Sequence, residues 1–477
     1  MIYASRMPGA FAAALAACLT ALPIHAAAID PDVAQDLARG GRMNVFLKVA
    51  SDADLSAAKG MPDKGARRQF VHDTLNAHAS ASQAALRGWL DTHGVRYLSF
   101  WINNSLYLYD VDATLVRELA TRSDVERVRG DHPLAIDAAV SQTAATSAPA
   151  TIEWNIEQIH ADEVWLHGNM GEGIVIANID TGVRYTHEAL RRQYRGNNGD
   201  GTFTHDYNWW DPQHNLAAPA DSVGHGTHLM GIAVGGDGLG PQANDIGVAP
   251  GARWIAAKGC AQLSCSQLSL ISAAQWVTCP TRVDGSDPDC TKAPDIVDNG
   301  WGGGGDDPWF HSYVSAWRAA GIIAVFSVGA GGPSCRSIGS PADYPEVVGV
   351  GATDMNDVLE SFSSRGPGAF RPLKPDIVAP GESIRSASNT GDTAYVIFSG
   401  TSMAASHVSG TLALVLAAKP SATYAEAYRA LAVGAERNLG PPPGAQSCAG
   451  RPYNQYPSFI YGWGRVDADG AAMAITR

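Results

Sequence analysis

The sequence predicts an α/β protein with an open, mostly parallel sheet and helices on both faces, preceded by a smaller α+β unit. Three observations predict this fold class. From about residue 152 onward, continuous apolar runs such as IVIANI, IIAVFSV and VVGVGA alternate with helical stretches, as buried parallel strands do. Residues 43–131 instead contain short alternating strands and two helices. A stretch rich in Ala, Ser and Thr, residues 137–151, separates the two and is typical of an exposed linker.

The smaller unit has a recognisable order of elements. MNVFLKVA predicts a strand, residues 66–93 a helix, and VRYLSFWINNSLYLYDV two strands around the turn signal Asn103-Asn104. A helix capped by Asp112 follows, and VERVRGD closes the unit as a strand. The order strand, helix, strand, strand, helix, strand is the ferredoxin-like pattern.

Composition limits the classes of function. The chain has 477 residues, of which 45% are hydrophobic, enough for two or three domains with a large core. The formal net charge of −13 argues against nucleic acid or an anionic membrane as the main partner, because both are negatively charged. Beyond the N-terminal stretch, the sequence contains no run of 18 apolar residues, so we expect no membrane span there.

The first residues predict export. Arg6 precedes the apolar run AFAAALAACLTALPI, and small residues follow, which is the pattern of a signal peptide over residues 1–28 with cleavage near Ala26 to Ala28. LAAC, which ends at Cys18, resembles a bacterial lipoprotein box, but the residues after it are apolar where a polar tether would be expected. A secreted, periplasmic or cell-surface protein is therefore favoured over a lipid-anchored one.

The six cysteines after Cys18 predict disulfide bonds, since an even number is typical of exported chains. The absence of any C-x-x-C spacing weakens a metal-binding interpretation. The short separations along the chain favour two pairs and leave a third: Cys260 with Cys265, Cys279 with Cys290, and Cys335 with Cys448.

Three stretches contain residues suited to catalysis. Asp180 ends the apolar run IVIANID, and sites in open α/β sheets gather at the carboxyl ends of strands. His225 lies between two glycines where a helix is predicted to begin. Ser402 begins an apolar helix that runs to about Lys419, where free backbone N–H groups suit a nucleophile whose attack builds negative charge. Taken singly, each has a structural alternative: a turn aspartate, a core histidine (for which His228 is the better candidate) and an N-cap serine.

Together the three residues predict nucleophilic catalysis. A serine hydroxyl needs a histidine to take its proton and a carboxylate to orient that histidine. Asp180, His225 and Ser402 occur in the order Asp, His, Ser, which is one of three chain orders in which this triad is built. An aspartic peptidase would need a second carboxylate motif, and a zinc enzyme would need ligands at suitable spacing.

These motifs carry a family resemblance. DTGV, GHGTH and GTSMAASH resemble the three signature motifs of the subtilisin-like serine peptidases (subtilases), and IGVAPGARWIAAKGC, SFSSRGP and YGWGRVDADGAA resemble further segments of that family. The match spans roughly residues 154–470 and is closest to the bacillopeptidase F-like branch. It implies a subtilisin-like catalytic domain over residues 152–477, and an inhibitory propeptide over residues 29–136 that acts as an intramolecular inhibitor and folding chaperone.

The resemblance also assigns roles. It implies Ser402 as nucleophile, His225 as general base and then acid, and Asp180 as the orienting carboxylate. NGWGGG matches the strand that pairs with an extended substrate, with Trp301 beside a pocket lined by Gly302 and Gly303. The chemistry requires no cofactor. Calcium is frequent in the family, and the acidic loop residues are a candidate site, although a solvated loop is the preferred interpretation: Asp200, Asp206 and Asp211.

Three positions depart from the family pattern. Ala330, in VFSVGAGGPSC, stands where the family has an asparagine that donates to the oxyanion. Gly300 stands where serine is usual, and Ser406 where proline is usual. We therefore expect a secreted serine endopeptidase, processed near the linker, with weakened oxyanion stabilisation. The alternative is a catalytically feeble homologue that serves as a peptide- or protein-binding module.

Overall fold

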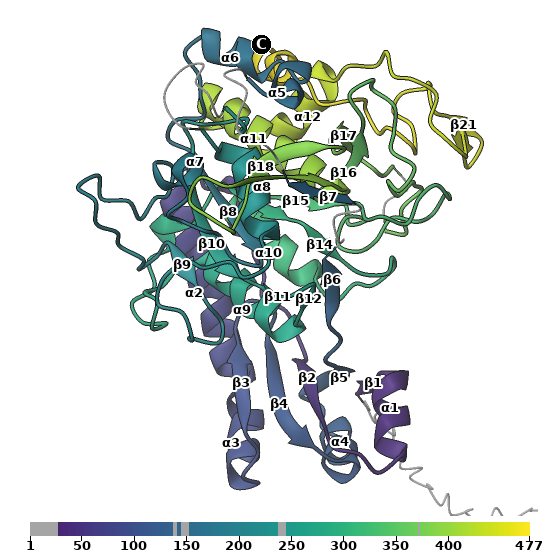
Figure 1. The fold of residues 1–477 in the computed structure, drawn as a ribbon. Coiled ribbons are helices and arrows are strands. Elements are labelled where there is room, and N and C mark those ends of the chain that lie inside the picture. The colour runs from purple at the N-terminus through teal and green to yellow at the C-terminus, as the bar shows by residue number, and fades with distance from the viewer. Residues whose placement is uncertain (1–26, 137–140, 145–151, 237–244, 371–372) are drawn as a thin grey trace, which may run out of the picture.

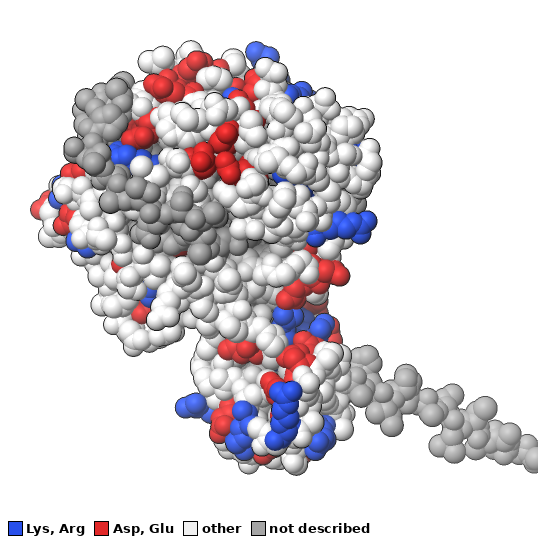
Figure 2. Space-filling view, turned by 45° about the vertical axis from the view of Figure 1, so that its right-hand side comes forward, with Lys and Arg blue, Asp and Glu red and all other residues white. Residues whose placement is uncertain are grey.

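The computed structural model describes residues 27–477 except 137–140, 145–151, 237–244 and 371–372. Figure 1 shows a large part, which contains most of the chain, and a smaller part below it, which is built from the N-terminal strands and helices. Figure 2 shows Lys, Arg, Asp and Glu crowded together on the smaller part, whereas the face of the large part in that view is mostly uncharged.

The large part is organised around a seven-stranded sheet in which every neighbouring pair is parallel. The predicted α/β class is therefore confirmed. The spatial order of the strands in the sheet differs from their order along the chain, because the connections between parallel strands cross over the faces of the sheet. From one edge to the other the strands are β17 (Ile377–Pro380), β16 (Val348–Thr353), β15 (Ile323–Ser327), β13 (Ile296–Asn299), β8 (Val175–Asp180), β10 (Arg253–Lys258) and β9 (Trp209–Trp210).

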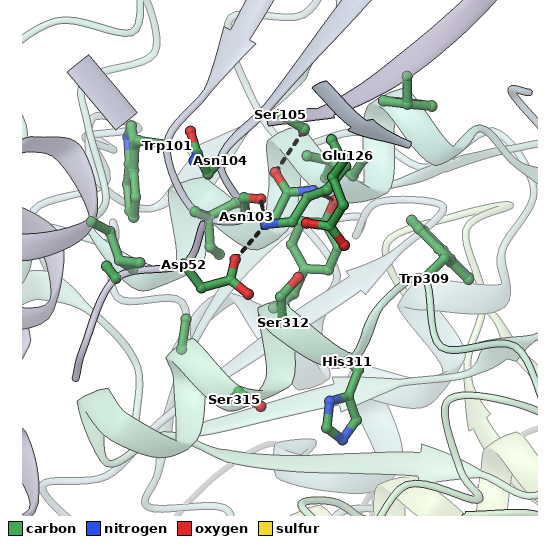
Figure 3. Close-up of a pocket in the computed structure, with 18 of the residues that line it drawn as sticks. Asp52, Trp101, Asn103, Asn104, Ser105, Glu126, Trp309, His311, Ser312 and Ser315 are labelled. Atoms are coloured by element: carbon green, nitrogen blue, oxygen red, sulfur yellow. Dashed lines mark hydrogen bonds and ion pairs between the residues drawn. The ribbon is translucent and has the colours of Figure 1, made fainter. Parts of the chain in front are cut away.

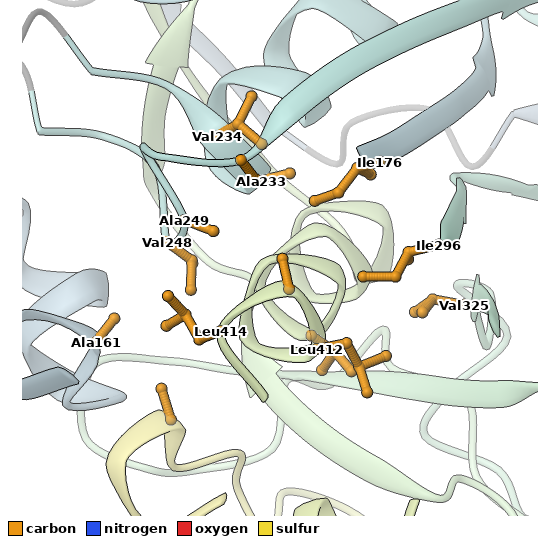
Figure 4. Packing of buried hydrophobic residues seen from close by; sticks show 14 of the residues in the cluster. Ala161, Ile176, Ala233, Val234, Val248, Ala249, Ile296, Val325, Leu412 and Leu414 are labelled. Atoms are coloured by element: carbon orange, nitrogen blue, oxygen red, sulfur yellow. The ribbon is translucent and has the colours of Figure 1, made fainter. Parts of the chain in front are cut away.

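Helices cover both faces of this sheet, because successive residues of a strand point to opposite sides. On one face Ile176 of β8 and Ile296 of β13 pack in a cluster with Leu412 of helix α11 (Thr401–Ala418), as Figure 4 shows. Helices α8 (His225–Val234) and α13 (Ala468–Thr476) share that cluster. On the other face Ala177 and Val297 pack with α9 (Gln267–Thr278) and α10 (His311–Ala320).

Shorter elements complete the large part. Its remaining helices are α5 (Trp154–Gln158), α6 (Ala161–Leu166), α7 (Glu188–Arg191), α12 (Tyr424–Gly434) and the 3-10 helix η2 (Cys290–Lys292). Its remaining strands are β11 (Cys260–Ala261), β12 (Ser264–Cys265), β14 (Trp301–Gly302), β18 (Ile384–Ala387), β19 (Tyr395–Ser399), β20 (Ser447–Cys448) and β21 (Arg451–Pro452).

The smaller part is a five-stranded sheet with helices against it. The strands, in spatial order, are β1 (Ala28–Ile29), β5 (Val125–Gly130), β2 (Met43–Val49), β4 (Ser105–Val111) and β3 (Tyr97–Phe100). The helices are α1 (Pro31–Ala38), η1 (Ser56–Gly60), α2 (Lys64–Ser82), α3 (Ala84–Thr92) and α4 (Ala113–Ala120). The turn expected at Asn103-Asn104 is present, with Asn104 at φ 50°.

One helix of the smaller part differs from expectation. The single helix predicted over residues 66–93 is two helices, α2 and α3, which meet at Gln83. The Gln83 side chain is buried, and its amide donates to the Phe100 carbonyl at 3.1 Å and to Asn104 Oδ1 at 3.0 Å. Val71 and Leu75 of α2 belong to the cluster shared with the large part, whereas Leu86 and Leu90 of α3 belong to the core of the smaller part.

The two parts contact each other through a shared cluster of buried apolar side chains and through charged and polar groups. Arg129 donates two hydrogen bonds to the Asp307 carboxylate at 3.0 and 2.7 Å, and Arg68 donates to Asp295 at 3.1 Å. A cavity of about 560 Å³ lies at this contact, with Asn103 of the smaller part and Trp309 of the large part in its wall (Figure 3). Its wall contains none of the three residues predicted to be catalytic.

Three disulfide bonds join the cysteine pairs that the separations favoured: Cys260–Cys265, Cys279–Cys290 and Cys335–Cys448. Within the described residues, α11 is long and apolar enough to cross a membrane by composition, but 89% of it is buried inside the protein. Residues 1–26 of the predicted signal peptide, which include Cys18, lie outside the described residues. Residues 137–140 and 145–151 of the predicted linker also lie outside them.

Candidate active site

Asp180 and His225 are brought together by the end of one strand and the start of one helix. Asp180 is the last residue of β8, and His225 is the first residue of α8. The His225 Nδ1 atom lies 2.8 Å from Asp180 Oδ1, and the side chains are buried, with 4% and 0% exposed. Because an ionised carboxylate only accepts hydrogen bonds, a proton on Nδ1 completes this contact, and Nε2 of the neutral ring is then the nitrogen that can accept a proton.

Glycine at position 226 permits this close approach. A Cβ atom there would lie 2.3 Å from the Gly182 carbonyl oxygen and 3.1 Å from the Cβ of Asp180. The Gly226 N–H donates instead to Thr181 Oγ1 at 3.0 Å. The residue after the histidine in GHG therefore lets the helix begin directly against the strand that ends in Asp180.

Asp221 fixes the segment that leads into His225. Its Oδ1 atom accepts from the Gly224 N–H at 2.8 Å, and its Oδ2 atom accepts from the backbone N–H and the hydroxyl of Thr227 at 3.0 and 2.7 Å. Since these donors lie on both sides of His225, the carboxylate holds the histidine backbone from before and after. Asp221 was not among the residues predicted from the sequence, where its position four residues before His225 was the only indication of this role.

Ser402 lies in the first turn of the buried helix α11 and is itself fully buried. Its hydroxyl donates to the carbonyl oxygen of Gly300 at 3.1 Å. Gly300 also adjoins the other two residues, because a Cβ atom on it would lie 2.8 Å from His225 Cε1 and 3.2 Å from Asp180 Oδ2. The three residues predicted from the sequence thus gather around Gly300.

Gly300 also makes room for a large side chain. A Cβ atom at this position would lie 2.6 Å from Leu229 Cδ1, closer than side chains approach one another. Leu229 is fully buried in α8, one turn after His225. Glycine at position 300, where serine is usual in the family, therefore leaves the space that the Leu229 side chain occupies.

The turn that contains Ala330 lies against the start of α11. The Gly329 N–H donates to Thr401 Oγ1 at 3.3 Å, and the Gly331 N–H donates to Ser364 Oγ at 2.9 Å. Ala330 itself is exposed, and its methyl group has no donor. Asn299, on a neighbouring strand, has its amide nitrogen engaged by the carbonyls of Val297 and Val325.

A second buried carboxylate, Asp298, lies beneath α11 and was not predicted from the sequence. Ser406 Oγ donates to Asp298 Oδ2 at 2.7 Å, and Ser409 Oγ donates to Oδ1 at 2.9 Å. Burial raises the pKa of Asp298 to about 7, and the nearby Asp180 adds to this rise, whereas the two serine hydroxyls oppose it. Ser406 in place of the usual proline is thus explained, since proline could not donate this bond.

The residues expected to pair with substrate lie beside an extended segment of the same chain. Strand β6 (Leu134–Ile136) runs antiparallel between β14 and β12. Ile136 lies opposite Trp301 and Ala135 opposite Gly302. On the other side Ala135 lies opposite Ser264, a residue that the sequence analysis did not single out.

Trp301 contributes its backbone to this pairing, not its side chain. The indole is fully buried, packs edge-on against Phe310 and Phe326, and donates to the Ile179 carbonyl at 2.9 Å. The indole therefore lies in the core, and the substrate pocket expected beside Trp301 stays a prediction. Gly303 instead faces β6: a Cβ atom there would lie 2.6 Å from Leu134 Cδ2.

A second extended segment follows β6 along the chain. Strand β7 (Ser141–Ala144) pairs antiparallel with β19, with Ser141 opposite Ser399. β19 leads directly through Gly400 into α11 and Ser402. The chain before residue 137 and the chain after residue 140 therefore both pair with strands that adjoin the three clustered residues.

Other candidate residues have structural partners. His228 donates from Nε2 toward the carbonyls of Ile384 and Val396 at 3.1 and 3.2 Å, and burial lowers its pKa to about 3. It is thus a neutral core histidine. The three acidic loop residues accept hydrogen bonds from three different parts of the chain, at the N–H groups of Thr202, Val283 and Leu216 respectively: Asp200, Asp206 and Asp211.

One group of metal-ligating side chains is found across the described residues: His72, Cys279 and Cys290. The two cysteines are joined in a disulfide bond, so they are not available as thiolate ligands. Calcium binding at the acidic loop stays a prediction.

Known proteins resemble this chain over most of its length. The model of the subtilase family matches residues 171–464. Bacillopeptidase F of Bacillus subtilis is 36% identical over 453 residues, which cover 90% of this chain and 30% of that protein. Serine protease AprX of Bacillus subtilis is 30% identical over 60% of this chain and 67% of its own length. Subtilisin DY of Bacillus licheniformis is 29% identical over 68% of this chain and 99% of its own length. The chain therefore spans less than a third of bacillopeptidase F.

Proposed function

Because the chain belongs to the subtilase family, we propose that it is a secreted serine endopeptidase that acts through Asp180, His225 and Ser402. The observation that carries this proposal is the buried 2.8 Å hydrogen bond between Asp180 and His225, with Ser402 beside the same Gly300. The names of the relatives, among them a serine protease and several subtilisins, agree with it.

In the proposed reaction the Ser402 hydroxyl oxygen attacks the carbonyl carbon of the scissile peptide bond, and its proton passes to Nε2 of His225. Asp180 holds the Nδ1 proton and stabilises the imidazolium that forms. The C–N bond then breaks, the amine leaves with the proton from Nε2, and Ser402 is left acylated. Water then attacks the ester carbonyl and gives its proton to Nε2 of His225; the bond to Ser402 Oγ breaks, Oγ takes up that proton, and the carboxylic acid product leaves.

The developing oxyanion is the weak point of this mechanism. The backbone N–H of Ser402 stands at the start of α11, where the helix leaves its first N–H groups without partners inside the helix. Ala330 adds no side-chain donor. Removal of one such donor slows a serine peptidase roughly 100- to 1000-fold, about 2.7–4 kcal/mol. We therefore propose an enzyme with reduced turnover, not an inert one.

The position of β6 supports an inhibitory role for the N-terminal part. It pairs on both sides with strands of the large part, as an extended substrate would, and the Arg129–Asp307 ion pair is one of the contacts between the two parts. We place self-cleavage within residues 137–140, which lie outside the described residues, because β6 ends at Ile136 and β7 begins at Ser141. The N-terminal part would then be an intramolecular inhibitor that is released after processing.

Export and independence from cofactors complete the proposal. Three disulfide bonds in one chain favour an oxidising compartment such as the extracellular space or the periplasm. The acid–base and nucleophilic chemistry assigned to the three residues requires no metal. Substrates are peptides and proteins that can present an extended segment to β14.

Self-processing tests the proposal directly. The full chain is expressed as wild type, as Ser402→Ala and as Ser334→Ala, an exposed serine that serves as the control. We expect wild type and Ser334→Ala to yield a mature fragment whose N-terminus lies between residues 138 and 141. Ser402→Ala should remain uncut and hydrolyse no peptide. Processing of Ser402→Ala at the same place and rate would contradict the proposal.

A further inference from the structure

The strand that flanks β6 on the side away from Trp301 is short, as is β14 on the Trp301 side. β12 has two residues, Ser264 and Cys265, and its other neighbour β11 also has two. A hairpin of this size is at best marginally stable by its own hydrogen bonds. Yet β12 must keep a fixed register for Ser264 to lie opposite Ala135 of β6. Among the described strands only β11 still pairs with β12 once β6 is released, so a further constraint on the β11 side would fix this register together with helix α9, which begins after Ser266.

The Cys260–Cys265 disulfide supplies that constraint. The two cysteines lie directly opposite each other in the β11–β12 register and are bonded across it. Both are buried, with 2% and 0% exposed. Cys265 has Cys260 on one side and Leu134 of β6 on the other. The covalent bond is therefore one strand away from the bound segment.

The loop closed by the disulfide also contacts the bound segment itself. The Ile136 N–H donates to the carbonyl of Leu263, which lies between the two cysteines, at 3.2 Å. Leu134 is 9% exposed and belongs to the same apolar cluster as both cysteines and Ile338. Both the backbone pairing and the side-chain packing of β6 thus involve this small hairpin, which lies beside β6 in Figure 1.

We propose that the Cys260–Cys265 disulfide determines substrate specificity, by holding β12 as the outer strand that binds extended peptides several residues before the cleaved bond. The proposal rests on the proposed peptidase function. The substrate class it names is an extended peptide with a medium-sized aliphatic side chain at the place of Leu134. Gly303 fits this class, since the Leu134 methyl group occupies the space where a larger residue would carry its Cβ.

The three residues assigned to catalysis are carried by other elements. Asp180 ends β8, His225 begins α8, and Ser402 lies in α11. Loosening the hairpin should therefore weaken the binding of long substrates and leave the nucleophile intact. This separates a specificity role from a general contribution to stability, which would affect all substrates alike.

The test compares two substrates on the processed protein. One is an ester of a single acylated amino acid, and the other is a tetrapeptide anilide with leucine four residues before the cleaved bond, which is the place of Leu134 when the chain is cut after residue 137. For Cys260→Ser/Cys265→Ser we expect kcat/KM on the tetrapeptide to fall at least 10-fold, mainly through KM, and kcat/KM on the ester to change less than 2-fold. Cys279→Ser/Cys290→Ser, which opens another short disulfide loop, should leave the ratio of the two values unchanged.

A reductant provides a second route that does not depend on how the variant folds. Dithiothreitol added to processed wild type should lower the ratio of tetrapeptide to ester activity by a similar factor, and should not lower it further in Cys260→Ser/Cys265→Ser. Equal losses on both substrates, or an unchanged ratio in both experiments, would overturn the inference while the peptidase function stands. Wild type that cleaves neither substrate and resists a fluorophosphonate would overturn the proposed function, and the inference with it.

Discussion

The two sides of Ser402 are built differently. On one side His225 and Asp180 are buried and joined by a 2.8 Å hydrogen bond, and Asp221 holds the histidine backbone through three further bonds. On the other side the turn after β15 presents Ala330, which is exposed and has no side-chain donor. The comparison teaches that activating a nucleophile and stabilising an oxyanion are separate tasks of the structure. In the proposed function this chain keeps the residues for the first task and lacks a side-chain donor for the second.

The largest expected effect comes from restoring the missing donor. Ala330→Asn should raise kcat by roughly 10- to 1000-fold with little change in KM, because the donor acts on the oxyanion and not on the bound substrate. Steady-state hydrolysis of a peptide anilide measures this. Ala330→Leu, which matches asparagine in size but carries no amide, is the control and should give no gain. An equal rate for the asparagine and leucine variants would show that the turn does not limit the reaction.

A smaller effect is expected on the intact side of the comparison. Gly300→Ser should lower kcat about 10-fold, because its Cβ would lie 2.6 Å from Leu229 Cδ1 and 2.8 Å from His225 Cε1 and would displace the imidazole. Adding Leu229→Val frees space and should recover part of the activity. A Gly300→Ser variant with full activity and an unchanged melting temperature would show that the histidine has more room than this geometry allows.

The smallest effect concerns Asp298, which is buried beneath α11 and bonded to Ser406 and Ser409. Its pKa of about 7 is above the usual value near 4, so the fold favours the protonated form. The stability that this form contributes is complete below about pH 4 and is lost as the pH rises through 7. Asp298→Asn is neutral throughout and can still bond Ser406 and Ser409 through its amide oxygen and nitrogen.

We therefore expect the melting temperature of wild type to fall more steeply between pH 5 and pH 8 than that of Asp298→Asn. Differential scanning calorimetry at four or five pH values measures the difference. Asp180 and His225 are the charged or titratable groups that act on Asp298 electrostatically, and both are unchanged in the variant. Parallel curves for the two proteins would mean that Asp298 does not titrate in this range.

The three clustered residues were predictable because each stands at the end of a strand or the start of a helix, inside a short distinctive motif. The disulfide pairs were predictable from their separations. The outer strand β12 was not, because two residues leave no periodicity in a sequence. The bond from Ser406 to Asp298 joins residues 108 positions apart, so it becomes visible only when the sheet places β13 under α11.

The central claim is that Ser402 is an activated nucleophile despite Ala330. The most direct measurement is labelling of the processed protein with a fluorophosphonate probe, located by peptide mass spectrometry, with Ser402→Ala as the control. We predict that the probe phosphonylates Ser402 with loss of fluoride, and that Ser402→Ala takes up no label. Folded, processed wild type that takes up no label at Ser402 would contradict the claim and favour a chain that binds peptides without cleaving them.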